Sequence, residues 1–276
     1  MKFKFFNKKI IIKFFKYLGM LLVATSCLII IKDEIFWILN GEEIYYEDFS
    51  FFDENCNVAK IDLKGFMDVE NYDGDSVSSS EIVSAIENAN NSENIKAIIL
   101  DVDSGGGYPI TGEEICNALI RTDIPTVTLI RGLGASAAYW AATGADVIFA
   151  SSLSDIGSIG VTISYLDNVA QNQIEGLHFN QLSTGEYKDT LNTNKTLTYN
   201  EKLLIERDLN ITLDNFIKVV SENRNINIDQ VRKMSDGSTM QGKMALENNL
   251  IDYIGDLYDV KTYLVEVIDE EVIICN

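Results

Sequence analysis

A serine that follows a glycine-rich turn is the first residue in this sequence whose setting suits covalent chemistry. Ser136 ends the stretch Gly132-Leu-Gly-Ala-Ser136 and precedes a run of alanines that is typical of a buried helix. At the start of a helix, free N–H groups and the positive end of the helix dipole stabilise negative charge. Small neighbours leave the hydroxyl accessible. Ser136 is therefore a candidate nucleophile, although a serine at this place is more often only a helix cap.

A second glycine-rich loop, residues 104–107, has the sequence Ser-Gly-Gly-Gly and also follows an apolar segment. One glycine is enough for a tight turn between a strand and a helix, because glycine adopts positive φ angles without strain. Three successive glycines also leave backbone N–H groups unshielded, as an oxyanion or a phosphate group requires. Both interpretations stay open on these residues alone.

A nucleophilic serine needs a base that accepts its proton. His178 is the only histidine, but residues 176–180 resemble the start of a strand, where a histidine is usually structural. Lysine can replace histidine when burial lowers its pKa. Lys188 follows an expected strand and a glycine turn. Its residue type alone does not distinguish it from an ordinary surface lysine.

The elements that must position these residues alternate between strands and helices. The hydrophobic patterns predict strands over 57–66, 95–102, 125–130, 147–150 and 158–163. They predict helices over 78–88, 111–122, 135–142 and 199–223, and a helix with turns over 231–256. Such an alternation predicts an α/β fold with a largely parallel sheet that is covered on both faces.

The N-terminal segment predicts export of the rest of the chain. Residues 1–16 contain six lysines and no acidic residue, and residues 10–31 are apolar enough to span a membrane if Lys13 and Lys16 reach the headgroups. Lysines before the apolar run keep the N-terminus in the cytoplasm. A cleaved signal peptide and a lipid anchor on Cys27 are alternatives that also export the body.

Composition argues against several classes of function. The net charge is −20, and the acidic residues all lie after residue 16. A protein domain this acidic repels nucleic-acid phosphates, and we therefore expect no nucleic-acid partner. The cysteines at 27, 56, 116 and 275 lack the spacing of a zinc site, and we expect no metal or other cofactor. A Cys56–Cys275 disulfide and free thiols are both compatible with the sequence.

Four blocks of sequence, in their order and spacing, resemble the signature stretches of the signal peptide peptidase A family, also called protease IV. The first three are residues 134–139, 156–161 and 183–189, which contain Ser136, Ser158 and Lys188 in turn. The fourth comprises residues 236–245 and 250–255. The resemblance covers about residues 55–260, and the blocks together are specific where each alone is not.

The resemblance implies a fold like that of Clp protease and crotonase, in which β-β-α units wind into a spiral. It also implies a serine/lysine dyad, with Ser136 as the nucleophile and Lys188 as the general base. Backbone N–H groups of Gly106 and Ala137 would form the oxyanion hole, and Ser158 would hold the lysine amine. The implied substrate-binding residues are Gly105, Gly107, Ile159, Gly160 and Val161.

Two departures from the family pattern bear on the site. Gly105 stands where the family usually has a proline, so the loop loses stiffness. Ala137 and Ala138 stand where the family often has glycines, and alanines fit there without strain only if their φ angles are negative.

The resemblance also implies assembly. Family members of this half-length type form rings in which each subunit completes its own dyad or shares sites with a neighbour.

We therefore expect a single-pass membrane-anchored serine endopeptidase whose peptidase domain lies outside the cytoplasm and degrades cleaved signal peptides or other membrane-associated peptides. The alternatives are a peptidase that acts on a membrane-scaffold protein, an inactive scaffold of the same fold, and a crotonase-type acyl-CoA enzyme. The expected segments are a basic cytoplasmic N-terminus (1–9), an anchor with a juxtamembrane part (10–39), a linker (40–55), the peptidase domain (56–265) and a tail (266–276).

Overall fold

The computed structural model describes residues 55–71 and 76–275. The expected membrane anchor over 10–39 and the expected linker up to residue 54 therefore lie outside the described residues. Within the described ranges, none of the helices combines the length and the apolar character that crossing a membrane requires.

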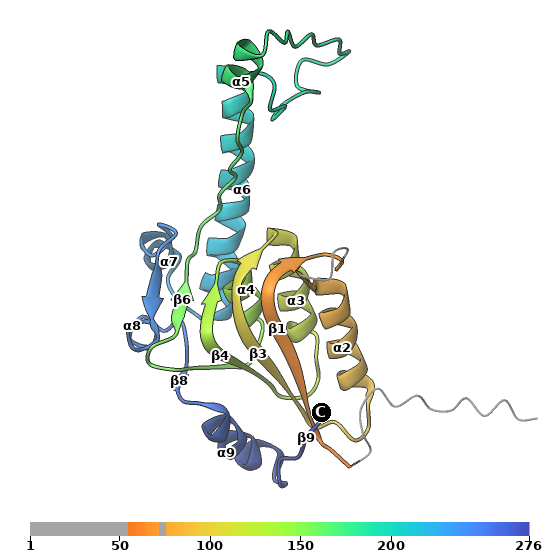
Figure 1. Ribbon diagram of the computed structural model, residues 1–276. Helices are drawn as coiled ribbons and strands as arrows, with labels where there is room; N and C mark the ends of the chain where they lie inside the picture. Colours follow the sequence, from red (N-terminus) through yellow and green to blue (C-terminus); the bar gives the residue numbers. More distant parts are fainter. Residues whose placement is uncertain (1–54, 72–75, 276) are drawn as a thin grey trace, which may run out of the picture. The chain divides into compact units, whose positions relative to one another are not determined.

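A mainly parallel sheet forms the centre of the described chain and confirms the predicted α/β class (Figure 1). Its strands lie in the order β2-β1-β3-β4-β5-β8, with bounds β1 (Val58–Asp68), β2 (Ser76–Ser78), β3 (Ala97–Gly107), β4 (Thr126–Ala135), β5 (Val147–Ala150) and β8 (Tyr253–Ile254). Two more strands are added in parallel, β9 (Ile274–Cys275) beside β1 and β6 (Asp155–Gly157) beside β4. The remaining strand, β7 (Thr239–Gln241), pairs antiparallel with β6.

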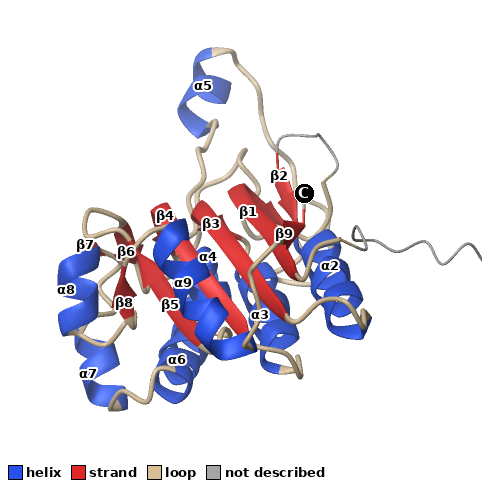
Figure 2. Cartoon of the chain, turned by 90° about the horizontal axis from the view of Figure 1, so that it is seen from below, coloured by secondary structure: helices blue, strands red, loops and turns tan. Residues whose placement is uncertain are grey.

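Helices cover both faces of this sheet. On one side lie α2 (Ser79–Asn91), α3 (Pro109–Ile120) and α4 (Ala137–Ala142), and on the other lies α9 (Leu257–Ile268) (Figure 2). A hydrophobic core lies on each face of the sheet, and alternate residues of β3 point into one or the other. Ile98 and Leu100 pack in the larger core, and Ile99 packs in the smaller core with α9. A strand that is buried on both faces must be apolar at nearly every position, which explains the continuous apolar run in the sequence.

The register of the central strands brings the two glycine-rich loops together. Both β3 and β4 continue into their loops, so that Ser104 pairs with Gly134. At the end of β4, Ala135 pairs with Gly157 of β6. The residues after all three strands therefore lie at one edge of the sheet, because parallel strands end on the same side.

The longest helix, α6 (Tyr199–Asn223), extends beyond the sheet (Figure 1). Its C-terminal half packs on the core through Phe216, Ile217 and Val220. Its N-terminal half and the preceding segment, which includes α5 (Val169–Ile174), form a region that we call the arm, residues 161–212. Within the arm only Leu197 and Glu201 are buried.

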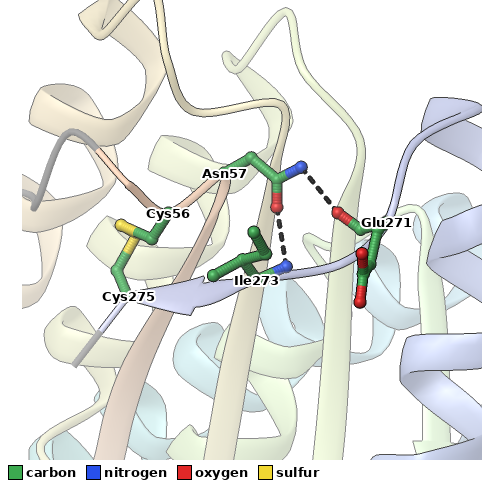
Figure 3. Close-up of a disulfide and its surroundings, with 5 residues drawn as sticks. All are labelled: Cys56, Asn57, Glu271, Ile273 and Cys275. Carbon is green, nitrogen blue, oxygen red and sulfur yellow. Dashed lines mark hydrogen bonds between the residues drawn. A yellow bond between two sulfur atoms is a disulfide. The ribbon is translucent and has the colours of Figure 1, made fainter.

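The C-terminal part continues through α7 (Ile228–Lys233) and α8 (Gly242–Glu247) to α9 and β9. A disulfide joins Cys56 to Cys275, which decides between the two alternatives that the sequence left open (Figure 3). Next to it, the Asn57 side chain accepts a hydrogen bond from the Ile273 N–H and donates one to the Glu271 carbonyl, both at 2.9 Å. Part of the segment expected as a tail, 266–276, thus pairs with the first strand of the domain.

Two predicted strands are wrong. The strand expected over 158–163 is absent, because the chain leaves the sheet at Ser158, whose φ angle is 48°. The strand expected before Lys188 is also absent, since residues 177–183 are exposed and irregular. Ser158 and Ile159 bond to the turn 235–238 and not to a strand, and residues 177–183 pair with no strand that the structure describes. An alternating pattern in either segment therefore has no strand partner with which to form a sheet.

Candidate active site

Ser136 lies at the bend where β4 turns into α4. Its φ and ψ angles are 54° and −127°, a conformation that costs energy in a residue with a side chain and that tends to persist at functional sites. The Ser136 N–H donates to the Gly157 carbonyl at 2.8 Å, which fixes the bend against β6. The side chain makes no capping hydrogen bond and is partly exposed. The hydroxyl is thus free of the capping role that was its more ordinary interpretation.

The glycine loop packs directly against this bend. A Cβ atom on Gly106 would lie 2.9 Å from the Ser136 Cβ and 2.8 Å from the Ala137 nitrogen, and the φ angle of Gly106 is 96°. Only glycine meets both conditions. A Cβ on Gly107 would collide with the Met67 carbonyl of β1. Gly106 therefore allows the end of β3 to approach the nucleophile, and Gly107 allows it to pack against β1, which is more than a tight turn requires.

The two predicted oxyanion donors differ in their present bonding. Ala137 is the first residue of α4, so its N–H has no partner within that helix. The Gly106 N–H donates to the Ser104 hydroxyl at 3.0 Å, and that hydroxyl donates to the Gly65 carbonyl at 2.6 Å. Among the described residues no backbone carbonyl accepts from the Ala137 N–H, whereas the Gly106 N–H has to leave Ser104 before it can bind an oxyanion.

The alanines that follow the nucleophile fit their positions. The positive φ angle belongs to Ser136, and neither Ala137 nor Ala138 has one. Both alanines are buried in the first turn of α4, where their φ angles are ordinary. Alanines fit at these two positions only if their φ angles are negative, and they are not among the residues with positive φ.

Ser158 lies beside the nucleophile on a loop that is supported from behind. Its hydroxyl donates to the Gly237 carbonyl at 2.8 Å, and its N–H donates to the Ser238 carbonyl at 3.0 Å. The Gly237 N–H in turn donates to the Ile159 carbonyl at 3.1 Å. The turn 235–238 thus holds the loop after β6, and the Ile159 side chain, only 1% exposed, points into the core.

A cavity of about 410 Å³ is lined by half of the predicted site residues. It is lined by Ser136 and Ser158 and by three of the predicted substrate-binding residues, Gly107, Gly160 and Val161. The other lining residues were not predicted as site residues: Pro109, Thr162, Leu213, Ser235, Asp236 and Gly237.

Asp236 is the one ionisable side chain that lines this cavity in the described part of the chain. Its Oδ1 accepts hydrogen bonds from the Ser238 hydroxyl and N–H, at 2.6 and 2.9 Å, and these lower the pKa of Asp236. The carboxylate is therefore charged at neutral pH. Its only signal in the sequence is its place at the start of the fourth family-like block, residues 236–245.

Lys188 lies elsewhere, in the arm. It is exposed and lines a second cavity of about 500 Å³ that is formed by the arm residues 179–184, Asp189 and Asn192. It forms no ion pair with any described residue. His178, also exposed, lies in the same part of the arm and lines neither cavity. Within one copy of the chain, the cavity around Ser136 contains neither candidate base.

Comparison with known proteins adds a family match. Residues 118–269, more than half of the chain, match the profile described as Peptidase family S49. Protease 4 of Salmonella typhi is 30% identical over 229 residues, which are 80% of this chain and 36% of that protein. Protease 4 of Haemophilus influenzae is 29% identical over 204 residues, 72% of this chain and 32% of that protein.

A plant relative matches as well. The protein named Serine protease SPPA, chloroplastic, of Arabidopsis thaliana is 25% identical over 187 residues, 67% of this chain and 28% of that protein. The chain thus spans about a third of these three relatives and about half of the length of others.

Proposed function

This chain belongs to peptidase family S49, and from that premise we propose that it is a serine endopeptidase in which Lys188 of a second copy acts on Ser136. The observation that carries the proposal is the Ser136 hydroxyl, which makes no capping hydrogen bond, lies at a strained bend against the glycine loop and lines a cavity. A nucleophile, backbone donors and an open cleft are the parts that acyl transfer needs.

The proposed reaction proceeds in two stages. The neutral Lys188 amine takes the Ser136 proton as Oγ attacks the peptide carbonyl carbon, and the carbonyl oxygen becomes an oxyanion. The Ala137 N–H and a donor of the glycine loop stabilise that charge. The Lys188 ammonium then protonates the leaving amine as the C–N bond breaks, and water, activated by the same amine, releases the acyl group from Ser136.

Two features support a base from a second copy. The amine of a lysine is neutral near pH 7 only when it is buried away from water, and Lys188 is exposed in one copy. The arm also exposes several large apolar side chains, among them Leu166 at 87%, Ile174 at 88% and Leu182 at 99%, and such side chains can contribute to a contact with another chain. A neighbouring copy would cover both, and repetition of such a head-to-tail contact closes into a ring.

The substrate side of the proposal rests on the cavity wall. The loop 158–161 is held by the turn 235–238 on one side and borders the cavity on the other, so an extended peptide could lie along it. Small lining residues favour small or medium apolar side chains near the cut. Cleaved signal peptides, with their apolar segments, suit such a site, and a membrane-scaffold protein is the alternative substrate.

The location that we propose is the outer side of the cell membrane, with a single N-terminal span. The six lysines before the apolar segment support this topology. The Cys56–Cys275 disulfide supports it independently, because disulfides persist mainly outside the cytoplasm.

Labelling with a fluorophosphonate tests the nucleophile. The wild-type chain should be modified at Ser136, and Ser136→Ala should abolish labelling, whereas the exposed control Ser152→Ala should be labelled like the wild type. Equal labelling of wild type and Ser136→Ala would refute the assignment. A wild type that reacts with no probe, including a small peptide aldehyde, would identify an inactive scaffold.

Complementation tests the origin of the base. Ser136→Ala and Lys188→Met should each be inactive alone, and co-expression should restore about a quarter of the sites if the copies mix at random around a ring with head-to-tail contacts. A mixture that stays inactive would show that each dyad forms within one copy. Lys202→Met, which removes another exposed lysine of the arm, is the matched control and should keep full activity.

A further inference from the structure

The arm has to present Lys188 with little help from an apolar core, and we propose that Glu201 is the positioning residue that holds the Lys188 segment in place. This inference rests on the proposed function of Lys188. It assigns to Glu201 no contact with the substrate: the carboxylate acts through the loop that it ties to the start of α6.

Glu201 is an unusual residue for the arm. Its exposure is 2%, although nearly every other side chain between residues 161 and 212 is partly or fully exposed. A carboxylate is rarely buried unless its charge is paired and its oxygens accept hydrogen bonds. The burial of a charged group, in a region that buries almost nothing else, indicates that the polar contacts are what order this region.

Both carboxylate oxygens are occupied. The Lys195 ammonium donates to Oε1 at 2.6 Å, and the Thr190 hydroxyl lies 3.4 Å from the same oxygen. The Thr198 N–H and hydroxyl donate to Oε2 at 2.8 and 2.9 Å. Glu201 therefore connects three points of the loop that runs from Lys188 to the first turn of α6.

Only part of this arrangement is ordinary helix capping. A capping box joins Thr198 to Glu201 and satisfies N–H groups at the start of α6. Capping explains the contacts with Thr198, but it requires neither the Lys195 ammonium nor the Thr190 hydroxyl. Those two contacts reach back along the chain toward Lys188.

The connection to Lys188 is short. The Thr190 hydroxyl donates its single proton to the Tyr187 carbonyl at 3.0 Å, with the Glu201 Oε1 as the alternative acceptor at 3.4 Å, so Thr190 lies between Glu201 and the residue just before Lys188. The Thr190 N–H donates to the same carbonyl at 3.3 Å, and the Lys188 N–H donates to the Gly185 carbonyl at 3.2 Å. Lys188 thus sits within a series of turns whose fixed end is the Glu201 carboxylate.

Glutamine at position 201 is the sharpest variant, because it keeps the size and removes the charge. Its single carbonyl oxygen cannot serve all the donors, and its NH₂ group would face the Lys195 ammonium. Glu206→Gln is the matched control, since it removes an exposed carboxylate from the same helix. Lys195→Arg and Lys195→Met form a second pair, of which only the arginine keeps a cation for Glu201.

Two measurements on the full chain test the proposal. The first is the rate of fluorophosphonate labelling at Ser136 as a function of pH, and the second is amide hydrogen exchange over residues 185–195. We expect Glu201→Gln to slow labelling by about tenfold to a hundredfold, because a displaced base is a poor one. Its labelling should also require a higher pH than that of the wild type. The exchange of residues 185–195 should quicken, and the melting temperature of the core should follow that of Glu206→Gln.

The remaining variants sharpen the interpretation. Lys195→Met should lose labelling and protection in the same direction as Glu201→Gln, and Lys195→Arg should lose less of both. Unchanged exchange over 185–195 in Glu201→Gln would overturn the proposal. The proposal would also be overturned by a variant in which the amides of residues 185–195 exchange rapidly while Ser136 is labelled at the wild-type rate.

Failure of the proposed function is distinguishable from failure of this inference. If the wild type is not labelled at all, Ser136 is not the nucleophile of a peptidase. The exchange measurement still decides whether Glu201 orders the segment around Lys188, because that measurement needs no activity.

Discussion

At the scale of single residues, Gly106 determines how closely the glycine loop approaches the nucleophile. The backbone around Ser136 occupies the space that a side chain at Gly106 would need, and the Ala135 carbonyl oxygen lies 2.9 Å from the position of a Cβ atom there. Gly105 is different, since a Cβ there would meet only the Leu133 Cδ2 at an ordinary 3.5 Å. Two neighbouring glycines in one loop are thus under very different constraints.

We expect Gly106→Ala to inactivate the protein. The Cβ would push the Ser136 bend away, and the positive φ angle would add about 1–3 kcal/mol of strain. Labelling of Ser136 should fall by about a hundredfold or more, because the hydroxyl and the donors would no longer be aligned. Gly105→Ala is the control and should keep most of the rate. Equal rates for the two variants would contradict this account of the loop.

Residue patterns predicted the parts of the site unequally. Ser136 was recognisable from its own neighbours, because glycines before a serine and alanines after it describe a strand-to-helix bend. Lys188 was a base only by resemblance, since nothing around it in the sequence indicates burial. Asp236 was missed as a lining residue, because its approach to the Ser136 cavity depends on contacts between the turn 235–238 and the loop after β6, which are distant in the sequence.

At the scale of elements, hydrogen bonds within the arm join the first turn of α6 to the loop that carries Lys188. The hydrogen bond from Lys195 and those from Thr198 hold the pKa of Glu201 at about 2, below the ordinary value of 4.5. A carboxyl group whose pKa is lower in the folded state stabilises the fold fully above its ordinary pKa and loses that contribution as pH falls through the folded value. The order of the loop should therefore persist well into the acidic range.

Pepsin cleavage measures that persistence. We expect the wild-type segment 185–198 to resist pepsin at about pH 4 and to become sensitive by about pH 2, where Glu201 takes up a proton. Glu201→Gln should be cleaved in this segment at both values, since the residue carries no charge to lose. Resistance of the variant equal to that of the wild type at about pH 4 would argue against the carboxylate as the source of order.

Elements were predicted best where burial is greatest. The five long elements from β1 to β4 lie close to their predicted positions, and α6 begins and ends at the predicted residues. The predictions failed over 158–163, where the buried Ile159 lies on a loop, and over 177–183, where every residue is exposed. A short apolar pattern therefore does not identify a strand when the segment has no neighbouring strand to pair with.

At the scale of the whole molecule, the exposed apolar side chains of the arm should govern assembly. Ile174 is 88% exposed on α5 and does not line the cavity around Lys188. Ile174→Asp would place a charge in an interface between copies, and we expect sedimentation to show smaller particles and labelling of Ser136 to fall with them. Leu153→Asp, at a site that is 73% exposed outside the arm, should change neither.

The same measurement can fail in an informative way. If Ile174→Asp assembles like the wild type, the arm does not form the contact between copies, and the exposed side chains need another partner. If the variant dissociates but is labelled normally, the dyad is complete within one copy.

The disulfide between Cys56 and Cys275 has a mechanical consequence. The two cysteines are 219 positions apart in the sequence, so a single covalent bond bridges almost the entire described chain. A pulling force applied at the two ends of the domain would pass through that bond and leave the strands and helices between them unloaded. For the same reason, one cut anywhere between the two cysteines would leave both fragments attached to each other until a reductant opened the bridge.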